Sequence, residues 1–214
     1  MTTTCITWTA VGAVAAGLGA IATAWMACQT HKSNKNAKEA ILENKKGAFF
    51  DMVVSMYSNS RKTIEQMSII NEDCTTTPKP IGLDCLVYVY DKLFKTRLTT
   101  KIDRSKKPSE QKEESIVPEK KAVKETFEKI IHNRYPNIGT YLSSVVALVG
   151  MIDDEKTIDN KFKDKCIAYI KSQTTAGEKL WLYYYAIFDF DKRGMLNKYN
   201  VLTNVPEDRL ITMQ

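Results

Sequence analysis

The side chains best suited to acid–base or nucleophilic chemistry are few and scattered in this chain of 214 residues. Its two histidines, His31 and His132, are far apart in the sequence, and none of its five cysteines stands near a histidine at the spacing of a zinc site. The chain has no glycine-rich phosphate loop and no serine or cysteine nucleophile motif. We therefore expect no cofactor and no metal, and these residues indicate no particular reaction.

Two acidic segments need to be compared with known metal sites. Residues 153–155 are three acids in a row, but no further acidic or histidine side chain is spaced to join them, so they predict a solvated turn. The segment 189–194 is similar to the start of a calcium loop. Such a loop requires an oxygen ligand at its fifth position and a glutamate at its twelfth, where this chain has Arg193 and Asn200. Calcium binding is therefore not expected.

One long apolar segment lies at the start of the chain. Residues 5–28 contain no carboxylate, amine or guanidinium group. A bilayer core about 30 Å thick requires about 20 helical residues, so this segment is long enough to span it. A cleaved signal peptide would need a basic start and a shorter apolar core, whereas residues 1–4 include no Lys or Arg. We therefore predict an uncleaved transmembrane anchor over residues 1–30.

Basic residues follow the anchor directly, at Lys32, Lys35, Lys38, Lys45 and Lys46. Because Lys and Arg beside a span are retained in the cytoplasm, they predict a single-pass protein with a cytoplasmic C-terminal domain. They also account for most of the net charge of +6, and each attracts anionic lipid by about 1 kcal/mol. We expect the lipid membrane as a partner and no nucleic acid.

Small residues recur every fourth position within the anchor. They bring Gly12 and Ala16 onto one face of the predicted helix, and Gly17 and Gly19 onto neighbouring faces. Helices associate in lipid by close backbone packing, which small residues at this spacing permit. The pattern is consistent with a homo-oligomer, and equally with a simple span in which Ala and Gly are common.

The remaining residues, 31–214, predict one all-α domain, a helical bundle, because apolar positions recur every three or four residues. The block 138–152 is hydrophobic nearly all round and short for a span, so it predicts the central buried helix. The densely charged stretch 101–118 predicts a mobile loop. The predicted helices cover residues 33–70, 83–98, 118–135, 138–152, 157–172, 176–190 and 196–202.

Two features of these helices bear on function. The first helix carries an apolar stripe that includes Ile41, Leu42, Met52 and Met56 and predicts a core-facing side. The polar segment before that stripe leaves two alternatives open, a continuous helical stalk from the anchor or a flexible joint. Near the C-terminus, Thr175 and Glu178 have the spacing of a capping box, which predicts the start of a helix there.

A family resemblance is carried mainly by the segment 166–202. Its matching positions are Tyr169, Ile170, Gln173, Glu178, Leu182, Tyr183, Tyr184, Leu196, Lys198, Tyr199 and Leu202. With the segment 47–57, GAFFDMVVSMY, they resemble the phage abortive infection proteins of bacteria, whose members commonly carry N-terminal transmembrane helices. The chain departs from the family pattern at Thr174, Thr175, Tyr185 and Pro136.

The resemblance implies a role in anti-phage defence at the bacterial inner membrane, with a phage-derived trigger as partner. The candidate motif residues are Gln173, Glu178, Tyr183 and Tyr184, although a capping role for the glutamate and a core role for the tyrosines explain them as well. Many abortive infection toxins are helical RNases with an Arg four to six residues before a His, and neither histidine here has one. We favour a non-enzymatic sensor or effector, with a membrane-tethered toxin enzyme such as a nuclease as the alternative.

Overall fold

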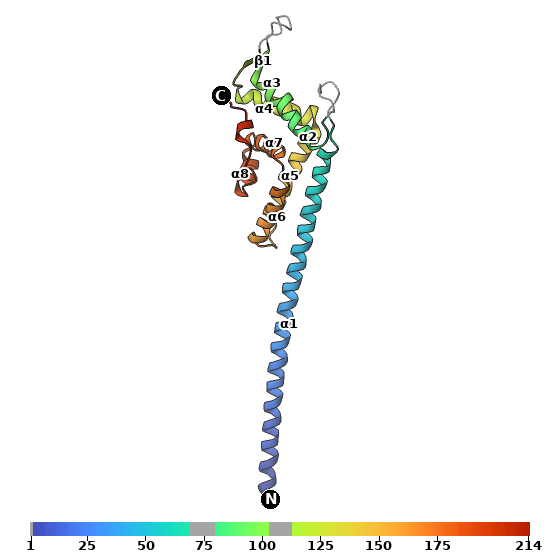
Figure 1. Ribbon diagram of the computed structural model, residues 1–214. Coiled ribbons are helices and arrows are strands. Elements are labelled where there is room, and N and C mark those ends of the chain that lie inside the picture. The colour runs from blue at the N-terminus through green and yellow to red at the C-terminus, as the bar shows by residue number, and fades with distance from the viewer. Residues whose placement is uncertain (1, 69–79, 103–112) are drawn as a thin grey trace. The chain divides into compact units, whose positions relative to one another are not determined.

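The computed structural model describes residues 2–68, 80–102 and 113–214 (Figure 1). The chain divides into two compact units, Met1–Phe49 and Phe50–Gln214. This division falls later in the chain than residue 30, where the sequence predicts the end of the anchor. The body, Phe50–Gln214, is a helical bundle, which confirms the all-α prediction for this part of the protein.

The first element is one uninterrupted helix, α1 (Thr2–Glu65), of 64 residues. It runs through the polar segment after residue 28, so the alternative of a flexible joint there was wrong. At about 1.5 Å of rise per residue, the helical segment 5–28 is about 36 Å long. All side chains from residue 22 to residue 45 are exposed.

Among the residues whose surroundings the structure describes, no single helix is both long and apolar enough to cross a bilayer. Two consecutive helical segments, Lys120–Arg134 and Pro136–Asp154, reach that length and composition only as a pair bent by 104°. The predicted anchor has a helical backbone, but its side chains up to residue 21 lie outside this description. Its insertion into a membrane stays a prediction.

The part of α1 that belongs to the body buries a narrower face than the sequence predicted. Val53, Tyr57 and Ile64 are buried, at the four- and seven-residue spacing of one helix face. The predicted core positions Ile41, Leu42, Met52 and Met56 are instead between 40% and 56% exposed. The helix also ends at Glu65 rather than at residue 70, since Met67 N–H turns back to the carbonyl of Ile64 at 2.9 Å.

The next predicted helix, 83–98, forms as three continuous pieces. They are α2 (Leu83–Tyr88), the π-helical segment η2 (Val89–Lys95) and α3 (Thr96–Thr99). Two short antiparallel strands follow, β1 (Thr100–Ile102) and β2 (Glu113–Ser115). The prediction of a loop throughout 101–118 was therefore wrong at 101–102 and at 113–115, and the segment 103–112 lies outside the described residues.

The centre of the body is α5 (Pro136–Asp154), which buries eight apolar side chains along its length. This confirms the prediction for 138–152. Before it come α4 (Lys120–Lys129) and the π-helical segment η4 (Ile130–Arg134), and after it come α6 (Asn160–Gln173) and α7 (Ala176–Ile187). Helix α5 contacts η4, α6, α7 and α8 (Phe190–Lys198).

The last helix begins earlier than predicted. Asp189 is the N-cap of α8, and its carboxylate accepts a hydrogen bond from the backbone N–H of Lys192 at 3.2 Å. The sequence therefore misplaced both the turn at 189–194 and the helix at 196–202, because an aspartate cap overrides the glycine at position 194. A short 3₁₀ turn, η5 (Glu207–Arg209), precedes the C-terminus.

A cluster of aromatic rings holds α7 against the segments on either side of it. The indole of Trp181 is fully buried and donates to the carbonyl of Leu86 at 3.0 Å. Phe94 from η2 and Phe127 from α4 lie 5.7 Å and 5.8 Å from the Trp181 ring centroid. These rings connect three parts of the chain that are distant in sequence, so they define the core around which the body folds.

The closest backbone approach in this core is at Gly139, on α5. A Cβ atom there would lie 2.5 Å from the carbonyl oxygen of Ile131, which is backbone and cannot turn aside. We predict that Gly139→Ala lowers the free energy of unfolding by about 1–3 kcal/mol, because the two helical segments must separate. The matched control is Gly194→Ala on α8, where a Cβ atom meets nothing within 4 Å.

The control substitution should raise stability by about 0.4–1 kcal/mol, because it removes backbone freedom from the unfolded chain. Urea unfolding of the purified full chain in mild detergent, followed by circular dichroism, measures both. Equal effects of the two substitutions would show that α5 and η4 do not pack this closely.

Candidate functional site

The structure encloses one acidic side chain in the core of the body, that of Glu178. Its side chain is fully buried at the start of α7. One carboxylate oxygen accepts the backbone N–H of Thr175 at 2.6 Å, and the Thr175 hydroxyl accepts the backbone N–H of Glu178 at 3.3 Å. This is the capping box that the sequence predicted, and it explains why a carboxylate occupies the first turn.

The other oxygen of Glu178 faces α5 and α1. Tyr141 donates its phenolic hydrogen to this oxygen at 2.7 Å. Arg61 Nε lies 3.9 Å from the same oxygen and 3.6 Å from Glu65 Oε1, and it forms no hydrogen bond among the described residues although it is buried. Glu178 thus receives two short hydrogen bonds and one longer-range charge contact.

A second hydrogen bond joins α1 to this region. The hydroxyls of Tyr57 and Thr174 lie 3.1 Å apart, and Thr174 donates to the carbonyl of Ile170 at 2.8 Å. Because Thr174 can donate only once, Tyr57 is the donor of the first bond. The residues of this network are referred to below as the Glu178 cluster: Tyr57, Arg61, Tyr141, Thr174, Thr175 and Glu178.

The Glu178 cluster shifts the acidity of its phenols. Burial raises the pKa of Tyr141 well above its usual range, and the negative charge of Glu178 raises it further. The pKa of Tyr57 is raised by the same two causes, in the same order. Both phenols therefore stay protonated and keep donating at neutral pH. A carboxylate that is fully buried and bonded in this way is suited to holding three helices together.

We predict that Tyr141→Phe lowers the free energy of unfolding by about 1.5–3 kcal/mol, because Glu178 then loses a hydrogen bond in the core. The matched control is Tyr183→Phe on α7, since the half-buried Tyr183 forms no hydrogen bond among the described residues. That control should change stability by less than about 0.5 kcal/mol. Urea titration measures the free energy of unfolding of both variants. An equal decrease in the two would mean that the hydrogen bond from Tyr141 does not stabilise the fold.

The four family-motif candidates do not come together. Gln173 is exposed at the end of α6, where its amide lies 3.5 Å from the hydroxyl of Ser172. Tyr183 is half-buried, with its ring edge-on to Tyr184 at 5.3 Å. Only Glu178 belongs to the buried cluster. The four residues therefore share a stretch of sequence and not a site.

Tyr184 takes part in a different network, which holds the C-terminal segment. Its hydroxyl accepts the backbone N–H of Ile211 at 2.7 Å, and the hydroxyl of Tyr90 lies a longer 3.4 Å from it. Tyr90 also lies 2.7 Å from the carbonyl of Arg209, whose guanidinium binds both carboxylate oxygens of Asp91. These contacts place the tyrosine in the core, as the alternative interpretation of the motif had it.

Two further motif residues, Lys198 and Tyr199, meet the end of α5. Tyr199 donates to Asp153 Oδ1 at 2.6 Å, and Lys198 lies 2.5 Å from the same oxygen. The two donors hold the pKa of Asp153 below its usual range, while burial and then the hydrogen bond to Asp153 raise the pKa of Tyr199 to about 12. The acids at 153–155 are therefore not a plain solvated turn, since one of them fixes α8 to α5.

Five buried tyrosines, at positions 57, 90, 135, 141 and 184, have a raised pKa, in each case mainly because burial disfavours the phenolate. A raised pKa in the folded state stabilises the fold fully below the unfolded value of about 10, and that contribution is lost as the pH rises above it. Ultraviolet titration of tyrosinate should therefore show these phenols ionising only as the protein unfolds. In urea all ten tyrosines should titrate together near pH 10, and a native protein that behaves in the same way would contradict the burial of these five side chains.

The anchor-packing candidates Gly12, Ala16, Gly17 and Gly19 lie within α1, but their side-chain surroundings are outside the described part. The groups of histidine, cysteine and acidic residues that the structure describes include none able to hold a metal ion.

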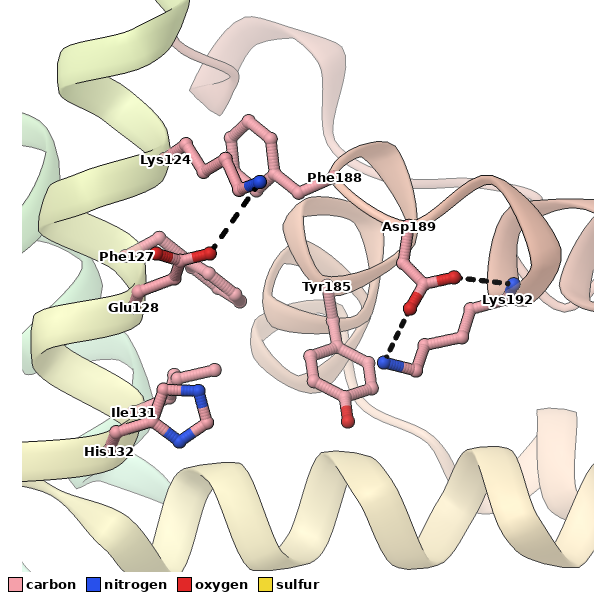
Figure 2. Close-up of a pocket in the computed structure, with 9 residues that line it drawn as sticks. All are labelled: Lys124, Phe127, Glu128, Ile131, His132, Tyr185, Phe188, Asp189 and Lys192. Carbon is pink, nitrogen blue, oxygen red and sulfur yellow. Dashed lines mark hydrogen bonds and ion pairs between the residues drawn. The ribbon is translucent and has the colours of Figure 1, made fainter.

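A surface pocket lies on the body between α4 and η4 on one side and α7 and α8 on the other (Figure 2). It has a volume of about 270 Å³ and contains one of the two histidines. We refer to it as the His132 pocket, and its lining consists of Lys124, Phe127, Glu128, Ile131, His132, Tyr185, Phe188, Asp189 and Lys192. Sequence spacing could not reveal this site, because its residues come from segments about fifty positions apart.

Comparison of the chain with models of protein families, with curated proteins and with solved structures gives no match. The resemblance to the abortive infection proteins stays a prediction from the motif positions given above.

Proposed function

We propose that this protein is a membrane-anchored component of bacterial anti-phage defence that acts as a sensor or effector without catalysing a reaction. The observation that carries the proposal is the continuity of α1. One helix holds the uncharged segment 5–28 and, further along, Tyr57 and Arg61 of the Glu178 cluster. A change at the membrane end of this helix can therefore reach the core of the body without crossing a loop.

The proposed membrane anchor is supported by the length of the segment 5–28 and by the positive charges that follow it. The segment 5–28 is helical and about 36 Å long, which exceeds the thickness of a bilayer core. Lys32, Lys35 and Lys38 are exposed directly after it, where they can meet anionic headgroups. The proposal places the anchor in the inner membrane and the body in the cytoplasm. Small residues in the anchor, Gly12 among them, would then permit a homo-oligomer.

The role that the proposal gives to the body is supported by the free-energy cost of disturbing a buried charge. Rotation of α1 about its axis would carry Arg61 away from Glu178 and would break the bond between Tyr57 and Thr174. Separating the partners of a buried ion pair costs several kcal/mol, so the position of α1 is coupled to the packing of α5 and α7. Such coupling is what a sensor of a phage component requires.

The second candidate is a membrane-tethered toxin enzyme such as a nuclease, and the His132 pocket is the observation that favours it. An imidazole beside two lysines could support acid–base chemistry. His132→Ala separates the two functions, because a nuclease that used this pocket would lose its toxicity and a non-enzymatic effector would keep it.

The anchor supplies the test of the proposal. Gly12→Lys combined with Ala16→Lys places two charges in the span, each costing about 2.5–3.5 kcal/mol at its centre, so we expect loss from the membrane fraction and loss of phage protection. The matched control exchanges the same positions without charge, as Gly12→Ala with Ala16→Gly. Fractionation and plating efficiency over a panel of phages measure both outcomes. Full protection against phage by the lysine variant would contradict the proposal, and so would a wild-type protein that protects against no phage of the panel.

A further inference from the structure

The His132 pocket has an apolar floor and a charged rim. Phe127 is buried, and its ring centroid lies 5.7 Å from that of Phe188 and 6.5 Å from that of Tyr185. Phe188 is only half-buried, so ring surface remains open toward the pocket, whereas Lys192 Nζ lies over the Tyr185 ring, 4.3 Å from its centroid. An aromatic or other flat apolar group is the natural occupant of such a floor.

The rim has more unused donors than unused acceptors. Asp189 is occupied on both oxygens, by the backbone N–H of Lys192 at 3.2 Å and by the ammonium of Lys192 at 2.7 Å. An ammonium group carries three hydrogens, so Lys192 retains donors beyond this bond. His132 is exposed, and its ring nitrogens form no hydrogen bond with any residue that the structure describes. In Figure 2 the rings of His132 and Tyr185 stand on opposite sides of the pocket.

The remaining pair, Lys124 and Glu128, is weakly held. Its charged groups are 3.7 Å apart, and about half of each side chain is exposed. Surface pairs of this kind contribute little, and lysine four residues before glutamate is the less favourable order on a helix. Lys124 can therefore leave Glu128 and bind an incoming negative charge, whereas the Asp189 carboxylate already has its partners.

We propose that the His132 pocket binds a small aromatic anion, a single ring bearing a carboxylate or phosphate group. The ring lies on Phe188 beside the edge of Phe127, and the anionic group accepts hydrogen bonds from Lys124, Lys192 and His132. A cavity of about 150 Å³ holds benzene, so about 270 Å³ accommodates one ring with its acidic substituent. This site is separate from the Glu178 cluster and does not depend on the proposed defence role.

Phenyl phosphate is the probe that tests the site, in saturation-transfer NMR on the full chain in mild detergent. A ligand of this size should bind with a dissociation constant of about 1 mM. Two comparison compounds separate the contributions: benzylamine carries the ring with a positive charge, and inorganic phosphate carries the charge without a ring. We expect phenyl phosphate to compete with benzoate, benzylamine to give no saturation transfer, and added inorganic phosphate to displace neither aromatic anion at equal concentration.

Charge reversal of one lysine localises the binding. Lys124→Glu should weaken phenyl phosphate binding about tenfold or more, because it replaces a charged donor by a repelling carboxylate. The matched control is Lys121→Glu, one turn earlier on α4, where the lysine is 83% exposed, pairs with Glu125 and does not line the pocket. Both variants should retain the wild-type circular dichroism spectrum, since both positions are on the surface.

Three results would overturn the proposal. Equal weakening by Lys121→Glu and Lys124→Glu would show attraction to the whole basic face of α4 and not to the pocket. Saturation transfer to benzylamine as strong as that to phenyl phosphate would show that the aromatic floor selects no anion. An unchanged affinity in Lys124→Glu together with Lys192→Ala would show that the ring binds elsewhere.

Discussion

The fold of the body depends on the hydrogen bonds and charge contacts made to the carboxylate of Glu178, which is fully buried. An isolated buried charge would cost many kcal/mol, so every helix that touches it must supply a donor or a positive charge. Thr175 does so from the start of α7 and Tyr141 from α5, while Arg61 on α1 supplies charge without a hydrogen bond. The relative positions of three helices are thus fixed by one side chain. The aromatic cluster around Trp181 adds packed area and one directional bond, from the indole to the carbonyl of Leu86, but it encloses no charge.

The elements that could be predicted from the sequence are those specified by local patterns. The block 138–152 was identified as the central helix because its own residues are apolar all round, and the capping box because Thr175 and Glu178 bond within one turn. The buried face of α1 was predicted too wide. Met52 and Met56 have the right spacing for a core, yet burial depends on which partners a helix meets, and periodicity does not contain that information.

The candidate site was predicted poorly for a related reason. The family resemblance suggested Gln173, Glu178, Tyr183 and Tyr184 as candidate residues, whereas the structure directs them toward different neighbours. The partners that matter come from remote positions, such as Tyr141 for Glu178 and Tyr90 for Tyr184. The one signal that could have pointed to the cluster was Arg61, an arginine placed among the apolar positions that recur along the same helix.

The π-helical segment η2 has a consequence for how the length of this chain can vary. An α-helix turns by about 100° per residue, so losing one residue from α5 would rotate all that follows it away from the core. A π-helical turn already contains one residue more than an α-helical turn, while the residues before and after it still face the same side of the helix. Removing one exposed position there, such as Lys92, restores an α-helical turn and keeps Leu86 and Leu98 directed to the same core. Related chains one residue shorter can therefore share this bundle, provided that the gap falls within η2.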